Sequence, residues 1–363
     1  MITTIPPQLI SYIAPGAPAT RRPARGDEPF LRPEVGFTPK WYHQALGIDF
    51  GERWHTEPER RLAGLAAMAR ELRRRFPGTN IGWVGDPSHP SDLLTGTFGG
   101  GVVAGIYGLP LVYARDNWPA VAPRYLSDEQ ADRLAPPDLN RNPFWEALLG
   151  QCDWIARETG RLEGYLNWQG VLNNAYRLRG QAIFEDLALE PERARHVFAC
   201  VTETMLEGAR RLYARQRQRG FEVRHFTISN CLVNMVSPGH YRDIILPYDR
   251  KLGEPFPVLG VHNCAWRVDP YLEHYATLPR VGYLDMGLDS DFGWARDLFP
   301  HARRAVMYRP TDLARKSPPE IQADLARIAR DLGPADVVLA DIEADTPDQR
   351  VQDVMRWCEE LGR

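Results

Sequence analysis

The sequence predicts a (β/α)8 barrel, an α/β fold, with an N-terminal extension. Short apolar runs rich in β-branched and aromatic residues recur from about residue 80 onward. Segments in which apolar residues follow helical spacing lie between most of these runs. The runs are almost continuously apolar, as are strands of a parallel sheet covered on both faces. With 363 residues, the chain is long enough for one such barrel.

Residues 1–55 are assigned to an irregular N-terminal arm and residues 56–363 to the barrel. The arm is suggested by residues 1–40, which are rich in Pro, Gly and Arg and show no sustained period. The expected strands are 80–85, 110–115, 163–168, 223–229, 257–262, 280–286, 303–308 and 335–341. The expected helices are 57–76, 191–220, 237–252, 317–333 and a last helix in which Thr346 is the N-cap and Pro347 the first residue.

An open, doubly wound sheet is the alternative architecture. Its usual signature is a glycine-rich phosphate loop between a strand and a helix. The segment GTFGGGVVAGIYG (96–108) is glycine-rich, but it lacks the GxGxxG spacing at such a turn. A mobile loop is therefore the favoured interpretation of this segment.

Composition excludes several classes of function. A net charge of −3 favours neither a nucleic-acid partner nor a membrane surface. The chain has no apolar run long enough to span a membrane, and its first residues do not resemble a signal peptide. Its 5 cysteines are widely scattered, which favours free thiols in a reducing, cytoplasmic environment.

Polar residues cluster at the predicted carboxyl ends of the strands, where barrel enzymes have their active sites. Asn167, Gln169 and Asn230 are candidates for orienting a substrate, unless they only satisfy buried backbone groups. Tyr165, Trp168 and Trp266 could be walls of an apolar pocket or parts of the core. The remaining polar residues at strand ends are Asp116, Asp285, Arg309 and Asp341.

The segment PVLGVHNCAW (257–266) indicates a metal site. An apolar strand ends there in His262 and Cys264, and side chains at positions i and i+2 of a strand point to the same face. Imidazole and thiolate are ligands of zinc and similar metals. The pair alone is a weak signal, so a third ligand would decide the matter.

The chain resembles the uroporphyrinogen decarboxylase superfamily, which includes corrinoid-linked methyltransferases. The resemblance begins at EGYLNWQGVLNNAYRLRG (163–180) and rests on three further segments. SPGHYRDIILPY (237–248) is similar to a Ser-Pro-x-x-(Tyr/Phe) helix, and GVHNCAW (260–266) to a His-x-Cys strand end that the YLDM strand (283–286) follows. ADIEADTPDQRVQDV (340–354) is similar to the closing segment. The resemblance assigns to true decarboxylases an N-terminal Arg-Gln-Ala-Gly-Arg segment and a histidine in the closing segment, and this sequence has neither.

The methyltransferase branch implies a zinc ion held by His-x-Cys and a later cysteine. His262 and Cys264 match the first two ligands, but Ala340 stands where the later cysteine is expected. Asp285, 21 residues after Cys264, resembles the acidic zinc ligand of cobalamin-independent methionine synthase and is the first choice as third ligand. Asp341 and Cys231 are the other candidates, although Cys231 also fits a small buried apolar position.

The favoured function is methyl transfer between a small methylated substrate or a thiol and a corrinoid carried by a partner protein, assisted by zinc. The direction of transfer stays open, and the resemblance implies a homodimer. Asp341 and Asp116 are the expected acid–base residues, and Arg309 is grouped with the substrate-binding residues. One alternative is a metal-independent decarboxylase or lyase of a small acid or tetrapyrrole, with Arg177, Arg179 or Arg309 as carboxylate clamp. A second alternative is a non-catalytic protein that binds a corrinoid or tetrapyrrole.

Overall fold

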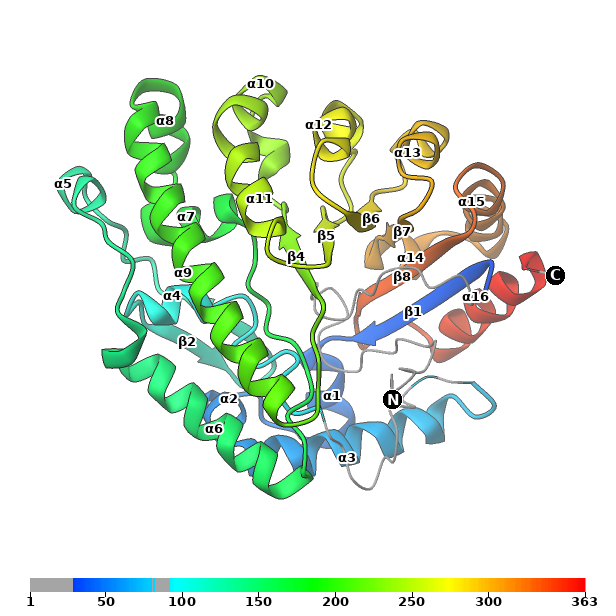
Figure 1. Ribbon diagram of the computed structural model, residues 1–363. Coiled ribbons are helices and arrows are strands. Elements are labelled where there is room, and N and C mark those ends of the chain that lie inside the picture. The colour runs from blue at the N-terminus through cyan, green and yellow to red at the C-terminus, as the bar shows by residue number, and fades with distance from the viewer. Residues whose placement is uncertain (1–28, 80, 82–91, 363) are drawn as a thin grey trace.

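A six-stranded parallel sheet forms the centre of the molecule (Figure 1). The computed structural model describes residues 29–79, 81 and 92–362. The strands follow the order β1-β8-β7-β6-β5-β4, and every neighbouring pair is parallel. Their bounds are Leu31–Phe37 (β1), His225–Ser229 (β4), Val258–His262 (β5), Val281–Met286 (β6), Arg303–Tyr308 (β7) and Ala335–Ile342 (β8). All carboxyl ends therefore meet at one edge of the sheet, where the predicted site lies.

The predicted α/β class is confirmed, whereas closure of the sheet into a barrel is not. Among the described residues, no strand joins β1 to β4. Of the expected strand 80–85, only Ile81 lies within the described residues. Residues 163–168 run beside β4, where the Thr227 amide donates to the Tyr165 hydroxyl, but they form no strand. Gly164, at φ 109°, interrupts the extended backbone there.

The expectation of an irregular arm over residues 1–55 is wrong for its described part. Strand β1 lies within it, as do helices α1 (Pro39–Leu46) and α2 (Glu52–Thr56). The β1 sequence LRPEVGF does not show the apolar pattern of a buried strand, because it contains Arg, Pro and Glu. Arg32 is nevertheless buried, since its guanidinium donates to both carboxylate oxygens of Asp336 in β8, at 2.8 and 2.6 Å. The ion pair with Asp336, which lies 304 residues later in the sequence, therefore allows Arg32 to be buried in this strand.

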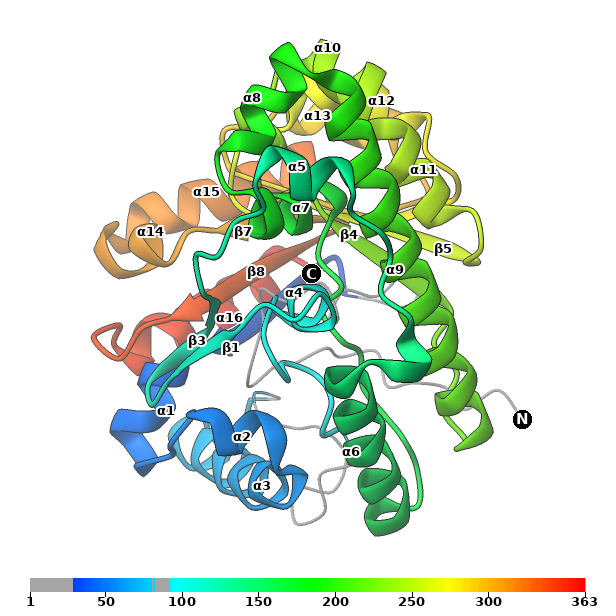
Figure 2. The ribbon, with the colours of Figure 1, turned by 90° about the vertical axis from the view of Figure 1, so that its left-hand side faces the viewer.

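Helices pack on the outer side of the sheet and around its open end (Figures 1 and 2). Those with predicted counterparts are α3 (Pro58–Arg75), α9 (Pro191–Gln218), α10 (Pro238–His240) with η4 (Tyr241–Ile245) and α11 (Leu246–Gly253), α15 (Pro318–Asp331) and α16 (Asp348–Leu361). The others are α4 (Val102–Ile106), α5 (Asp128–Asp132), α6 (Pro143–Thr159), α7 (Val171–Arg179), α8 (Ala182–Leu189), α12 (Leu272–Ala276), α13 (Phe292–Leu298) and α14 (Pro310–Arg315). Short η helices span Leu139–Arg141 (η2), Val233–Met235 (η3) and Asp269–Tyr271 (η5). None of the described helices is both long and apolar enough to cross a bilayer.

The segment 110–115 forms part of a separate hairpin and not of the parallel sheet. Strands β2 (Leu111–Ala114) and β3 (Asn117–Val121) pair antiparallel. Asp116 lies in the two-residue turn between them and is exposed. The glycine-rich segment before this hairpin is a series of turns followed by α4, whose five residues are buried, so it packs into the protein.

Candidate metal centre

Three potential metal ligands meet at the carboxyl edge of the sheet. Cys231, His262 and Cys264 offer two sulfurs and one ring nitrogen, all within 4.8 Å of one another. The two sulfurs lie 2.9 Å apart, and the Cys264 sulfur lies 3.3 Å from Nε2 of His262. Strands β4 and β5 pair so that Ser229 is opposite His262, which places Cys231, two residues beyond Ser229, beside the histidine.

Cys264 reaches this group by a turn and not by strand alternation. Strand β5 ends at His262, and Cys264 has a φ of 57°, in the left-handed region that few residues other than glycine adopt. The predicted convergence of the two side chains is therefore correct, but its expected cause is not. A strained backbone at a cluster of reactive side chains is typical of functional sites.

Asp285 lies behind His262 and does not belong to the ligand group. Its Oδ2 is 2.6 Å from Nδ1 of His262, on the ring nitrogen opposite to the one that faces the sulfurs. Its Oδ1 accepts a hydrogen bond of 2.6 Å from the backbone N–H of Asn263. The prediction of Asp285 as third metal ligand is therefore corrected, since Cys231 takes that place. A carboxylate in this position fixes the ring orientation and the tautomer of a metal-binding histidine.

Further hydrogen bonds hold the carboxylate and the turn in place. Tyr283 donates to Oδ2 of Asp285 at 3.1 Å. The side-chain NH2 group of Asn263 donates to the backbone carbonyl of Asp285 at 2.8 Å, and its side-chain oxygen accepts from the Tyr275 hydroxyl at 2.7 Å. All of these groups are buried. Asn263, the middle residue of the HNC motif, is thus a support of the site that the sequence analysis did not identify.

The surroundings of the two thiols shift their pKa values in opposite directions. The hydrogen bond that Cys264 donates holds the pKa of Cys231 well below its usual range, and His262 adds to this effect against the opposing influence of burial. The same hydrogen bond, together with burial, raises the pKa of Cys264 well above its usual range. Burial lowers the pKa of His262, but the negative charges of Asp285 and Cys231 outweigh it and raise that pKa to about 10. These surroundings therefore favour ionisation of Cys231 over that of Cys264.

The donor set fits zinc or a similar borderline metal. Two thiolates and one imidazole are a common set of ligands for catalytic zinc, which keeps a fourth position open for water or substrate. Ala340, at the position of the missing cysteine, packs in a small apolar cluster with Tyr283, Met307 and Ala265. Asp341 is exposed beside it, and its charge contributes to the raised pKa of Cys264.

The loop that precedes α7 lies directly against the end of β4. A Cβ atom on Gly170 would come within 2.2 Å of the Ser229 carbonyl oxygen, so only glycine allows this approach. The approach brings Gln169 toward the candidate metal centre. Its Oε1 accepts hydrogen bonds from Asn173 at 3.0 Å and from Arg177 at 3.1 Å. Asn173 also accepts a hydrogen bond from the backbone amide next to Cys231, that of Leu232, at 3.2 Å.

Three of the other predicted site residues are buried. Tyr165 stacks on His225, at the opposite end of β4 from Cys231. Trp168 is buried against Gly208 of α9. The Asn230 side-chain amide donates to Asp249 at 2.9 Å. Nε1 of Trp168 and Oδ1 of Asn230 have no hydrogen-bond partner among the described residues, so a role of these side chains in substrate binding stays a prediction.

The remaining predicted residues lie at the periphery. Asn167 accepts a hydrogen bond from the Gln169 amide and shapes the loop before α7. Trp266 packs edge-on against Tyr271, with ring centroids 5.4 Å apart. Arg309 precedes α14 and forms a hydrogen-bonded ion pair with Asp312 at 2.8 Å. Asp116 lies in the β2–β3 turn, so the structure does not give it the expected place at the carboxyl edge of the sheet.

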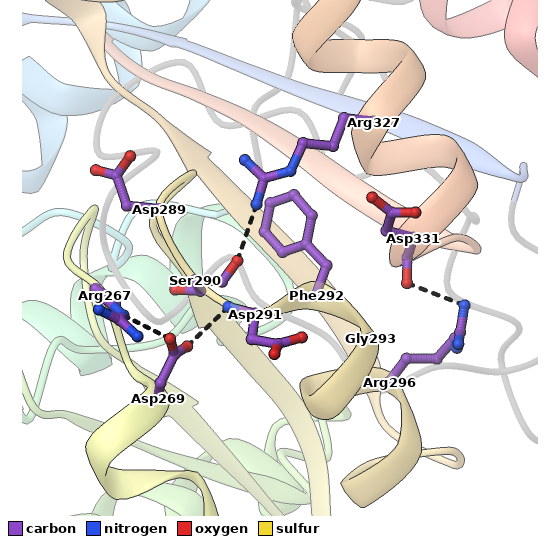
Figure 3. Close-up of a pocket in the computed structure, with 10 residues that line it drawn as sticks. All are labelled: Arg267, Asp269, Asp289, Ser290, Asp291, Phe292, Gly293, Arg296, Arg327 and Asp331. Atoms are coloured by element: carbon purple, nitrogen blue, oxygen red, sulfur yellow. Dashed lines mark hydrogen bonds and ion pairs between the residues drawn. The ribbon is translucent and has the colours of Figure 1, made fainter.

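A charged surface pocket lies beyond the loops that follow β5 and β6 (Figure 3). Its arginines are occupied by the protein itself. Arg327 donates to the Ser290 carbonyl at 3.1 Å and Arg296 to the Asp331 carbonyl at 3.1 Å. These two arginines therefore have partners within the protein.

Comparison with known proteins supports the fold. No family model and no curated protein matches the chain. Among solved structures, a methyltransferase from Methanosarcina mazei matches with a TM-score of 0.61. The match covers 92% of this chain and 94% of that chain at 15% sequence identity. At this identity, the likeness concerns the arrangement of strands and helices.

Proposed function

We propose that the protein is a methyltransferase whose metal centre is formed by Cys231, His262 and Cys264. The observation that carries the proposal is the convergence of two thiols and one imidazole at the carboxyl edge of a parallel sheet. The resemblance of the HNC segment to the His-x-Cys motif, together with the fold shared with a methyltransferase, favours methyl transfer over other metal-assisted reactions.

Each residue of the proposed site has its own role. Cys231, Cys264 and Nε2 of His262 would hold a zinc ion, and Asp285 keeps the proton of His262 on Nδ1 so that Nε2 faces the sulfurs. When bound, zinc lowers the pKa of a coordinated thiol or polarises a methyl-bearing heteroatom. Asp341, exposed at the same edge, is the proposed acid–base group. The methyl group would pass to or from a corrinoid on a partner protein, in a chain that we expect to be dimeric.

Metal content tests the first part of the proposal. We expect elemental analysis to find about one zinc per chain, a stoichiometry set by the single donor group. The variants Cys231→Ala, His262→Ala and Cys264→Ala should each lose it. Cys200→Ala is the matched control, because Cys200 is also a free cysteine near a histidine, His196, at 3.9 Å, but lies on α9 outside the group. Retention of zinc in all three variants would show that the metal binds elsewhere.

Methyl transfer tests the second part. Zinc-loaded protein should demethylate free methylcobalamin in the presence of a thiol, measured by the change in visible absorbance. The Cys231→Ala variant should not do so. A protein that holds zinc and binds corrinoid without any transfer would instead support the non-catalytic binding alternative. Absence of zinc even after it is supplied would favour a metal-independent reaction.

A further inference from the structure

We propose that Arg177 binds an anionic group of the substrate, so that the substrate is a small molecule with a heteroatom for the metal centre at one end and a carboxylate or similar oxyanion at the other. The contact between the heteroatom and the metal centre depends on the proposed function. The contact between the anion and Arg177 is inferred from the surroundings of Arg177 alone.

Arg177, which is partly buried, differs from the buried arginines Arg61 and Arg304 in how few partners it has. Arg61 donates from Nε, Nη1 and Nη2 to three oxygens at 2.7–2.8 Å, and Arg304 likewise uses all three nitrogens. Arg177 donates from Nη1 only, to Gln169 at 3.1 Å and to the Asn173 carbonyl at 3.4 Å. Within the described part of the chain, its Nε and Nη2 have no hydrogen-bond acceptor and it forms no ion pair. A planar guanidinium with two nitrogens to spare suits the two oxygens of a carboxylate.

The surroundings of Arg177 point the same way. Burial lowers the pKa of its guanidinium, and no carboxylate among the described residues forms an ion pair with it. A bound anion would supply this missing partner.

Arg177 is connected to the metal centre by two side chains. Its Nη1 and the Asn173 amide group share Oε1 of Gln169 as acceptor. The same Asn173 accepts a hydrogen bond at 3.2 Å from the backbone amide of Leu232, the residue that follows Cys231. Arg177 therefore lies within the reach of a small molecule that contacts the sulfur cluster.

Gly100 contributes space beside the guanidinium. A Cβ atom at this position would lie 2.7 Å from Nη2 of Arg177 and 3.0 Å from the Gln169 amide carbon. Both atoms belong to the far ends of flexible side chains, so Gly100→Ala would displace the guanidinium without a clash against the backbone. This substitution moves the positive charge but keeps it.

Two small thiols of equal length test the proposal. Titration calorimetry of zinc-loaded protein compares 3-mercaptopropionate, which ends in a carboxylate, with 3-mercapto-1-propanol, which ends in a hydroxyl. We expect the charged thiol to bind at least about tenfold tighter, the difference that one charge-assisted hydrogen-bonded pair provides. Arg177→Gln should abolish this preference and leave the affinity for 3-mercapto-1-propanol within about twofold, because the loss is confined to one charge-assisted contact.

Two further variants separate recognition from folding. Gly100→Ala should reduce the preference by several fold, and unchanged urea unfolding would show that it folds normally. Arg211→Gln is the matched control, since Arg211 also lies on a helix and is partly buried but is paired with Glu207 at 2.6 Å. It should keep the full preference.

Propionate, which lacks a thiol, tests the anion site without any metal. Saturation-transfer NMR on metal-free protein should detect its binding to the wild type and to Arg211→Gln but not to Arg177→Gln. If zinc does not bind, this comparison alone decides the proposal, so failure of the metal centre and failure of the anion site remain distinct. Equal affinity for the two thiols in the wild type, a preference that survives Arg177→Gln, or propionate binding that is independent of Arg177 would each overturn it.

Discussion

Replacing Asp285 by Asn should weaken zinc binding although Asp285 is not itself a ligand. The carboxylate accepts hydrogen bonds from Nδ1 of His262, the Asn263 amide and the Tyr283 hydroxyl, at 2.6, 2.6 and 3.1 Å. An asparagine has a single acceptor oxygen and an NH2 group. If the oxygen faces His262, the NH2 group opposes the Asn263 amide. If it faces the Asn263 amide, the NH2 group donates to Nδ1 and moves the ring proton to Nε2, where it blocks the metal.

The magnitude follows from the hydrogen bond that is lost. A bond to a charged acceptor contributes about 1.5–3 kcal/mol, and residues that support a metal ligand typically affect affinity by about 10- to 100-fold. We therefore expect the dissociation constant for zinc to rise by about 10- to 100-fold, or about 1.4–2.7 kcal/mol. Tyr283→Phe removes only the longest of the three bonds and should cost less than about tenfold.

Competition with a chromophoric chelator at a fixed pH measures these affinities. Circular dichroism and urea unfolding of each metal-free variant provide the control for folding. An Asp285→Asn variant that is folded and binds zinc within about twofold of the wild type would refute the reasoning, because the expected effect is at least tenfold. The role assigned to the contact between Asp285 and His262 would then be wrong.

Three predictions concern stability, measured by urea unfolding. Asp336→Asn should cost about 3–5 kcal/mol, because buried Arg32 and Arg303 both donate to this carboxylate; a loss below about 1 kcal/mol would contradict this. Gly170→Ala should destabilise by at least about 1 kcal/mol through its backbone clash, and an unchanged midpoint would argue against the close approach. Burial lowers the pKa of His55 to about 3, so the stability that the neutral ring contributes is complete above pH 6.5 and is lost as the pH falls toward 3. Between pH 7 and 5 the wild type should lose about 2 kcal/mol more than His55→Gln, and equal losses would refute this.

The sequence predicts those parts of the fold whose signals are local. Strands β4 to β8 and the long helices α3, α9 and α15 coincide with expected segments because their apolar periodicity arises within each segment. Strand β1 could not be found in this way. Its buried Arg32 is tolerated because Asp336, distant in sequence, is paired with it. The segment 163–168 was expected as a strand from its apolar residues, but the conformation of Gly164 prevents it.

The candidate site was predictable to a similar extent. His262 and Cys264 are visible as a motif, whereas Cys231 is ranked last among the third ligands because no neighbouring residue marks it. Its place becomes clear only from the pairing of β4 with β5, which a sequence does not display. Asp285 shows the reverse case, since its position after the next strand is correct and its role is decided by which nitrogen of His262 it faces.

The 2.9 Å separation of the two sulfurs also makes the site sensitive to oxidation. A disulfide bond is about 2.05 Å long, so joining Cys231 to Cys264 requires the sulfurs to approach by less than about 1 Å. Both residues are partly accessible, whereas Cys152, Cys200 and Cys358 are buried. A two-electron oxidation would remove both thiolate donors at once, so oxidants and metal ions compete for the same pair of sulfurs. The redox history of a preparation therefore determines how much metal it can carry, and a count of two reactive thiols in the native protein shows that the site is intact.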